Sequence, residues 1–174
     1  MADQPALLID VDGVLNPGIH RGAGFTTHRL QPTGWTRTFD VALNPVHGVM
    51  LREFAAEHRV ELVWATTWVD DANTMIGPRI GLPELAVVPI PALRADSALT
   101  IGAWKAQHVA AWAGRRPFVW LDDEHNIASQ LARRRKAGEV GEHLVVQVSP
   151  KSGLRDRHLV KAAQWFARNL APTE

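Results

Sequence analysis

Apolar runs alternate with amphipathic segments along this chain. The apolar runs lie at residues 6–11, 60–66, 86–90, 117–121 and 144–148. They predict buried strands, because strands covered on both faces show no polar alternation. The amphipathic segments, near 46–58, 98–113, 126–137 and 156–170, predict helices. This order of strands and helices predicts an α/β protein with a central parallel sheet.

The helical periodicity also predicts which residues face the core. Asn44 and Pro45 are suited to the N-cap and first position of a helix. The expected core-facing residues are Val46, Met50 and Phe54 in this helix, Ile101, Trp104, His108 and Trp112 in the 98–113 helix, and Leu159, Ala163, Phe166 and Leu170 in the last helix, with Asp156 as its cap.

The segment between the first strand and the first helix has a different composition. Residues 17–36 are rich in Gly, Pro and Thr, which predicts a loop with a short hairpin. We find no repeat, low-complexity tract or linker in the 174 residues, so we expect a single domain over 1–174.

Composition narrows the class of protein. Hydrophobic residues make up 46% and charged residues 21%, as in ordinary globular proteins. The absence of cysteine excludes disulfides and thiolate metal sites. No apolar run approaches the roughly 20 residues of a membrane span, and the N-terminal run is too short for a signal peptide, so we expect a cytoplasmic protein.

Charge is unevenly distributed along the chain. Residues 1–113 carry 8 basic and 11 acidic side chains, whereas residues 114–174 carry 11 basic and 7 acidic ones. The resulting net charges of −3 and +4 are modest. They are compatible with an anionic substrate and do not require a nucleic-acid partner.

Polar residues that could carry chemistry follow three of the predicted strands. Asp10 and Asp12 follow the first strand, Thr66 and Thr67 end the second, and Asp122 with Asp123 follows the fourth. Ligands of open parallel sheets bind beyond the carboxyl ends of the strands. Four carboxylates at one edge would repel one another without a cation, and Mg²⁺ suits an oxygen site shared with phosphate. Asp12 reaches this site only if the backbone turns, as Gly13 permits.

These residues resemble the four motifs of the haloacid dehalogenase (HAD) superfamily of phosphohydrolases. Residues 7–14 resemble its first motif, an apolar strand followed by Asp-x-Asp-Gly and Thr or Val. Residues 64–67 resemble the second, Lys105 the third, and residues 119–124 the fourth. More narrowly, residues 7–16, 64–68 and 120–123 are similar to the HAD domain associated with Swiss Army Knife RNA-repair proteins.

The resemblance implies a role for each matched residue. Asp10 would attack phosphorus and form an aspartyl-phosphate, while Asp12 would act as general acid and then as general base. Thr66, with Thr67 as the alternative, would bind a phosphoryl oxygen. Lys105 would balance negative charge. The implied metal ligands are the Asp10 carboxylate, the Asp12 backbone carbonyl and Asp123, with Asp122 beside it; which of the doubled Asp pair coordinates stays open.

Lys105 has support that does not depend on the resemblance. If Ser97 or Thr100 caps its helix, Lys105 lies within the first two turns, near the positive end of the helix dipole. A phosphate would settle at that end, and a lysine there adds a point charge.

The resemblance also implies a fold and an accessible site. The expected architecture is a three-layer α/β/α Rossmann-like HAD fold with a small flap and no large cap domain, because neither gap between motifs can hold one. Capless members often accept bulky or macromolecular phosphoesters. The flap would be formed by residues 17–34, from which His20, Arg21, His28 and Arg29 could contact phosphate.

Several other features favour a structural interpretation. Of the seven tryptophans, those at 64, 104, 112, 120 and 165 are expected in the core, whereas Trp35 and Trp68 are candidate platforms for substrate. The basic run 133–136 fits a solvated helix end. The histidines lack the spacing of a zinc site, and His125 is the one to test because it adjoins the metal carboxylates.

The sequence therefore predicts a Mg²⁺-dependent phosphatase that hydrolyses a phosphomonoester, with nucleotides or nucleic-acid ends as the favoured substrates. The alternatives are phosphoryl transfer to another acceptor and a non-catalytic phosphate- or RNA-binding module that retains the fold. A dehalogenase is disfavoured, because Asp12 supplies the acid/base group that phosphatases of the superfamily need.

Overall fold

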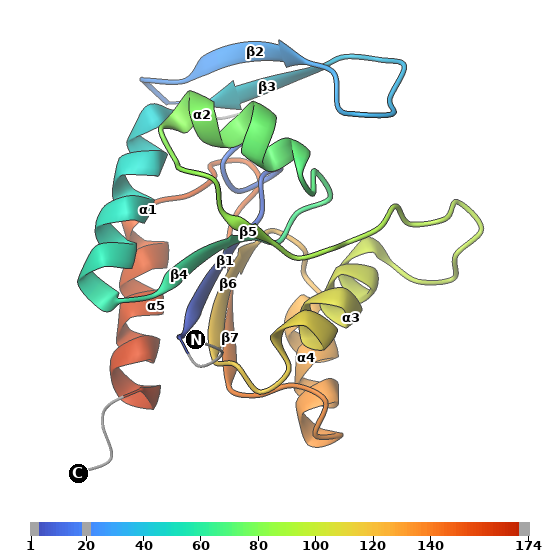
Figure 1. The fold of residues 1–174 in the computed structure, drawn as a ribbon, viewed down its shortest axis with the longest axis vertical. Helices are drawn as coiled ribbons and strands as arrows, with labels where there is room; N and C mark the ends of the chain where they lie inside the picture. Colours follow the sequence, from blue (N-terminus) through green and yellow to red (C-terminus); the bar gives the residue numbers. More distant parts are fainter. Residues whose placement is uncertain (1–3, 19–21, 171–174) are drawn as a thin grey trace.

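Five parallel strands form the centre of the protein in the computed structural model, which describes residues 4–18 and 22–170 (Figure 1). The strand order is β5-β4-β1-β6-β7, and every neighbouring pair is parallel. Their bounds are β1 Ala6–Ile9, β4 Glu61–Trp64, β5 Ala86–Val87, β6 Phe118–Asp122 and β7 His143–Gln147. The parallel sheet expected from the apolar runs is confirmed.

Helices cover both faces of this sheet. Helices α1 (Pro45–His58) and α5 (Asp156–Asn169) lie on one face, and α3 (Ile101–Ala113) and α4 (Ile127–Lys136) lie on the other (Figure 1). Alternate residues of β1 serve the two cores, because Leu7 packs on the α1 and α5 side and Leu8 on the α3 and α4 side. The architecture is the expected three-layer α/β/α arrangement.

The segment between β1 and α1 contains an antiparallel hairpin of β2 (Thr26–Leu30) and β3 (Phe39–Leu43). A hairpin is present as predicted, but only its first strand lies within residues 17–36, because β3 begins after that segment ends. A short π-helix, η1 (Ala72–Ile76), and α2 (Gly77–Ile80) follow β4. Within the described ranges, neither insertion forms a cap domain.

The predicted core faces of two helices are wrong in detail. In α1, Phe54 is buried as predicted and Met50 is partly buried, but Val46 is 56% exposed, and His47, Gly48 and Leu51 are buried in addition. The reason lies at Gly48, where a Cβ atom would lie 1.7 Å from the Ile80 carbonyl oxygen. This close approach of α2 turns the next face of α1 inward.

In α3 the aromatic stripe lies at the margin of the core. Trp104, His108 and Trp112 are only half-buried, and small residues around Lys105 face the sheet. A Cβ on Gly102 would lie 1.9 Å from Asn126 Oδ1, so this helix approaches its neighbours too closely for large side chains. In α5, Arg155 is the N-cap residue and Asp156 the first helical one, one position from the prediction.

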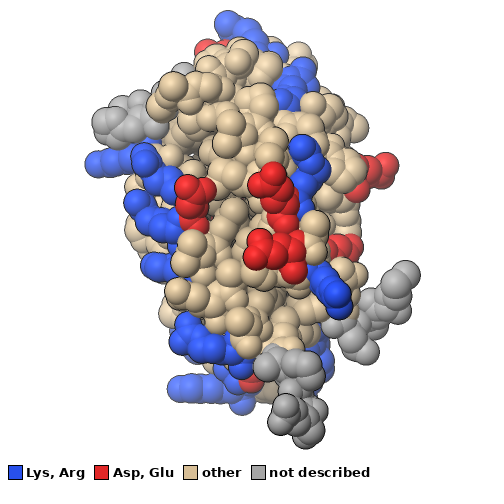
Figure 2. All heavy atoms as spheres, turned by 90° about the vertical axis from the view of Figure 1, so that its left-hand side faces the viewer, with Lys and Arg blue, Asp and Glu red and all other residues tan. Residues whose placement is uncertain are grey.

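Charge on the outer surface is dispersed. On the face formed by α1 and α5, acidic side chains lie near the middle, and Lys and Arg lie mostly around the margin (Figure 2). In the part of the chain that the structure describes, the helices are all too short or too polar to cross a membrane.

Candidate active site

The sheet topology brings the predicted residues to one place. The chain leaves β1 toward β4 over one face and later reaches β6 over the other, so the direction of winding reverses at β1. Such a reversal opens a crevice beyond the carboxyl ends of the strands. Asp10 follows β1, Thr66 and Thr67 follow β4, and Asp122 ends β6. These residues therefore border the same crevice.

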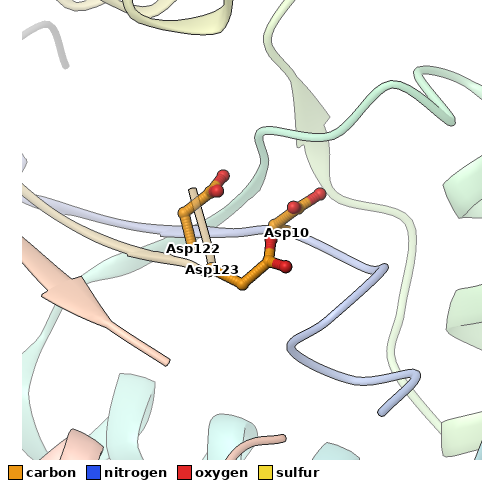
Figure 3. A group of neighbouring side chains, drawn as sticks. All are labelled: Asp10, Asp122 and Asp123. Carbon is orange, nitrogen blue, oxygen red and sulfur yellow. The ribbon is translucent and has the colours of Figure 1, made fainter. Parts of the chain in front are cut away.

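Three carboxylates meet at this point. Asp10, Asp122 and Asp123 each offer an oxygen atom, and these atoms lie within 4.8 Å of one another. Figure 3 shows the side chains of Asp10 and Asp123 side by side at the ends of β1 and β6. Asp122 is completely buried, and Asp10 is 5% exposed.

A buried lysine joins two of these carboxylates. Lys105 Nζ donates to Asp10 Oδ2 over 2.7 Å and also to Asp122 Oδ2. Lys105 lies in the second turn of α3, whose N-cap Thr100 accepts a hydrogen bond from Ala103 N over 3.2 Å. The predicted capping by Thr100 is confirmed. Burial lowers the pKa of Lys105, but the charges of Asp10 and Asp122 outweigh it and raise this pKa above its ordinary value.

The carboxylate group fits a divalent cation. With all three carboxylates and the ammonium ionised, the group has a net charge of −2, which a divalent ion neutralises. Burial, followed by the charge of Asp10, raises the pKa of Asp123 to about 6, and burial also raises the pKa of Asp122, so a bound cation would favour the ionised forms of both. All three side chains offer oxygen atoms, the ligands that Mg²⁺ prefers.

Gly13 makes room for Asp123. Its φ is +76°, and a Cβ atom built at this position would lie 2.3 Å from Asp123 Oδ2. The turn also bonds Gly13 N to the Asn16 carbonyl over 3.0 Å. Any side chain at residue 13 would therefore displace a carboxylate of the cluster.

The Asp12 carboxylate is not part of this cluster. Its Oδ1 accepts from Asn16 Nδ2 and its Oδ2 from Trp68 Nε1, both over 2.8 Å. Although the residue as a whole is exposed, burial of its carboxylate raises the Asp12 pKa; the two hydrogen bonds act in the opposite direction. Asp12 still lines the same pocket as Asp10 and Lys105. The side chain is thus held near the cluster without joining it.

Trp68 and Asn16 have roles that the sequence did not predict. Trp68 is 8% exposed and orients Asp12 through its indole N–H. Asn16 Oδ1 accepts from Ala42 N over 2.9 Å, which ties the hairpin to the turn that carries Asp12. The position of an Asn four residues after Asp12 was the available signal for the hydrogen bond between Asn16 and Asp12.

The two threonines after β4 differ in exposure. Thr66 is completely buried, and its Oγ1 accepts from the Trp68 backbone N–H over 3.3 Å. Thr67 is exposed and lines the pocket that contains Asp10, Asp12 and Lys105. Of the two hydroxyl-bearing residues, Thr67 is the one open to a ligand.

The pocket that contains Asp10, Asp12, Thr67 and Lys105, which we call the carboxylate pocket, has a volume of about 360 Å³. Asp123, Glu124 and Gly18 also line it. His125 is exposed and is not among the lining residues, nor are His28 and Arg29 of β2. His20 and Arg21, predicted to contact phosphate, lie outside the described residues.

The remaining predictions concern aromatic and basic residues away from this pocket. Trp64 and Trp120 are completely buried within strands, as expected. In the basic run 133–136, Arg134 pairs with Glu139 over 2.8 Å and Arg135 pairs with Glu142. The solvated helix end expected for this run is therefore confirmed, and the two ion pairs are additional.

Comparison with known proteins gives one match. The family model for the HAD domain in Swiss Army Knife RNA repair proteins matches residues 6–159. No curated protein and no solved structure was found to match the chain. The matched range includes every residue that lines the carboxylate pocket.

Proposed function

Because the chain belongs to the family of HAD domains found in Swiss Army Knife RNA repair proteins, which implies a phosphatase-type function, we propose that it is a Mg²⁺-dependent phosphomonoesterase. The observation that carries this proposal is the cluster itself. Three carboxylates lie within 4.8 Å of one another, and Lys105 Nζ contacts Asp10. Charge of this density at a strand-end crevice suits phosphate chemistry.

Asp10 is the nucleophile in the proposed first step. Its Oδ1 accepts a hydrogen bond from Val11 N over 2.8 Å, and its Oδ2 accepts one from Lys105, so the carboxylate is held in a fixed direction. A carboxylate oxygen bonds to phosphorus while the bond from phosphorus to the leaving oxygen breaks. Asp12 donates its proton to that oxygen, and an aspartyl-phosphate remains.

Water completes the reaction in the second step. Asp12, now ionised, takes a proton from water, whose oxygen bonds to phosphorus as the bond to Asp10 breaks. Trp68 and Asn16 hold the Asp12 carboxylate for both transfers. Inorganic phosphate leaves, and both carboxylates return to their starting state.

Asp10, Asp123 and the Asp12 backbone carbonyl are the proposed Mg²⁺ ligands, with Asp122 holding Lys105 beside them. Bound Mg²⁺ would supply positive charge that lets an anionic carboxylate approach an anionic phosphoryl group. Between the two threonines we favour Thr67 as the phosphate donor because it lines the pocket, whereas Thr66 is buried beneath it.

Nucleotides or nucleic-acid ends are the proposed substrates, in keeping with the RNA-repair description of the family. The test is hydrolysis of p-nitrophenyl phosphate with Mg²⁺, with EDTA, and by Asp10→Asn. We expect turnover in the first case and none in the other two. If neither p-nitrophenyl phosphate nor any of a panel of phosphoesters is hydrolysed with Mg²⁺, the domain is a phosphate- or RNA-binding module instead.

A further inference from the structure

A second pocket, which we call the aromatic pocket, adjoins the carboxylate pocket. It has a volume of about 300 Å³ and is lined by Trp35, Phe39 and Trp68 among others. Both pockets share Asp12, Asn16 and Thr67. Asp12 is the proposed donor to the leaving oxygen. The group attached to that oxygen therefore extends into the aromatic pocket.

Trp35 is exposed but held in place. It is 52% exposed, the backbone N–H donates to the Pro32 carbonyl over 3.1 Å, and its carbonyl accepts from Gln31 Nε2 over 2.8 Å. Its ring meets Phe39 edge-on with centroids 5.3 Å apart, and the Arg37 guanidinium lies 5.7 Å from the Trp35 ring centre. A large apolar ring that is held in one position while exposed to solvent is typical of a binding surface.

The hairpin that carries Trp35 is also tied to the body of the protein. Thr33 N donates to Asp71 Oδ2 and Thr33 Oγ1 donates to Asp71 Oδ1, both over 2.7 Å. Asp71 lies just before η1, in the segment that follows β4. Trp35 is thus positioned relative to Thr67 and Trp68 before any ligand binds, which lowers the entropic cost of binding.

The charged side chains that line the cavities beside Trp35 are acidic, although the Arg37 guanidinium lies over the Trp35 and Phe39 rings without lining either cavity. Asp40 lines the aromatic pocket, and a larger cleft of about 790 Å³ on the same tryptophans is lined by Asp70 and Asp71. Among the described residues that line the two cavities there is no Lys or Arg, and His108 is the one basic group. Burial lowers the His108 pKa, which disfavours the charged form of its ring. A polynucleotide backbone needs cationic partners along its path.

We propose that the aromatic pocket binds a nucleobase stacked on Trp35, and that the substrate is a nucleoside monophosphate rather than the phosphorylated end of a polynucleotide. The single phosphate occupies the cluster with Lys105, and the uncharged ring occupies the aromatic pocket. Donor groups of the ring or the sugar face Asp40, whose charge also repels a second phosphate. This inference rests on the proposed phosphatase function.

The first experiment measures kcat/KM for nucleoside 5′- and 3′-monophosphates and for ribose 5-phosphate, which lacks the base. We expect the wild type to prefer the nucleotides by about tenfold, the scale of one base stacked on one aromatic ring. Trp35→Ala should remove most of this preference. Trp35→Phe, the matched control, should retain most of it because a ring remains.

The second experiment adds phosphates to the substrate. Nucleoside 3′,5′-bisphosphates and short phosphorylated oligonucleotides should be hydrolysed at least about fivefold less efficiently than monophosphates, a penalty of the size that one nearby like charge imposes. Asp40→Asn should reduce the difference in kcat/KM between monophosphates and the substrates that carry more than one phosphate. Adenosine, which carries no phosphate, should bind the wild type and not Trp35→Ala in isothermal titration, independently of catalysis.

Equal kcat/KM values with and without the base, or an unchanged ratio in Trp35→Ala, would overturn the assignment of the aromatic pocket while leaving the phosphatase intact. A preference for oligonucleotides would overturn it in favour of a polymeric substrate. If even acetyl phosphate is not hydrolysed with Mg²⁺, the proposed phosphatase function itself fails.

Discussion

At the scale of single residues, a side chain at position 13 would have two separate effects, one on the backbone conformation and one on the space that Asp123 occupies. The positive φ of Gly13 disfavours any side chain, and its missing Cβ leaves space for Asp123. Gly138 has nearly the same φ, +75°, but nothing lies within 4 Å of the position of its Cβ. The two glycines therefore form a matched pair for substitution.

We expect Gly13→Ala and Gly138→Ala each to lower the free energy of unfolding by roughly 1 kcal/mol, because both impose a left-handed conformation on alanine. Only Gly13→Ala displaces Asp123, so it alone should weaken Mg²⁺ binding, by about tenfold or more. Chemical denaturation and calorimetric Mg²⁺ titration give the two quantities. Equal Mg²⁺ affinity in both variants would exclude Asp123 as a ligand.

Lys105 offers a second prediction at this scale. Lys105→Met leaves Asp10 and Asp122 buried without their cation, which should lower the free energy of unfolding by about 3–5 kcal/mol. Mg²⁺ should restore more stability to this variant than to the wild type, because the cluster is then more negative. The loss of stability and its recovery by Mg²⁺ are both measured by chemical denaturation with and without Mg²⁺.

The control for this substitution is Lys161→Met on the exposed side of α5, which should change stability by no more than about 0.5 kcal/mol. A loss in Lys105→Met as small as in the control, or one that Mg²⁺ leaves unchanged, would contradict the charge balance described for the cluster.

At the scale of elements, α5 begins with a buried titratable cap. Arg155 N donates to His158 Nδ1 over 3.0 Å, and His158 is 3% exposed. Burial, followed by the charges of Arg157, Lys161 and Arg155, lowers the His158 pKa from 6.5 to about 4. The unfolded chain therefore binds a proton at a higher pH than the folded protein does.

This difference destabilises the fold as the pH falls. The contribution of His158 is fully present above pH 6.5 and is lost toward pH 4, by as much as about 3 kcal/mol. His158→Gln keeps an acceptor at a position where Gln is favoured and does not titrate. Its stability should decline less steeply from pH 7 to pH 4 in denaturation experiments. His125→Gln, at an exposed site, should keep the wild-type slope, and parallel slopes for all three proteins would disprove the role of His158.

Much of the element order could be predicted from the sequence, whereas the buried faces of helices could not. Strands buried on both sides leave continuous apolar runs, so β1, β4 and β6 are evident from their residues alone. The orientation of α1 and α3 depends on backbone approaches at Gly48 and Gly102. Such approaches are set by tertiary packing and leave no periodic signal.

At the scale of the whole molecule, the parallel topology accounts for how well the cluster was predicted. Asp10 and Asp122 are far apart in sequence but follow adjacent parallel strands, so their meeting follows from strand order. The contact from Trp68 to Asp12 could not be predicted, because it depends on the path of the chain after β4. The same holds for the hairpin that carries Trp35.

The charge pattern of the whole molecule fits a small substrate. The basic run 133–136 lies at the end of α4, near the amino ends of the strands and away from the carboxyl ends that carry the carboxylates (Figure 1). Two of its arginines pair with Glu139 and Glu142. Among the described residues, this basic run therefore does not contribute cations to the pocket that contains Asp10 and Lys105.

The most direct test of the central claim, nucleophilic attack by Asp10, is the mass of the protein during turnover. Asp12→Asn cannot activate water, whereas p-nitrophenolate leaves without being protonated, so the aspartyl-phosphate should accumulate. After an acid quench with Mg²⁺ present, we predict a peptide containing Asp10 that is heavier by one phosphoryl group and loses it in hydroxylamine. The same peptide without added mass, while p-nitrophenol is released, would contradict the account.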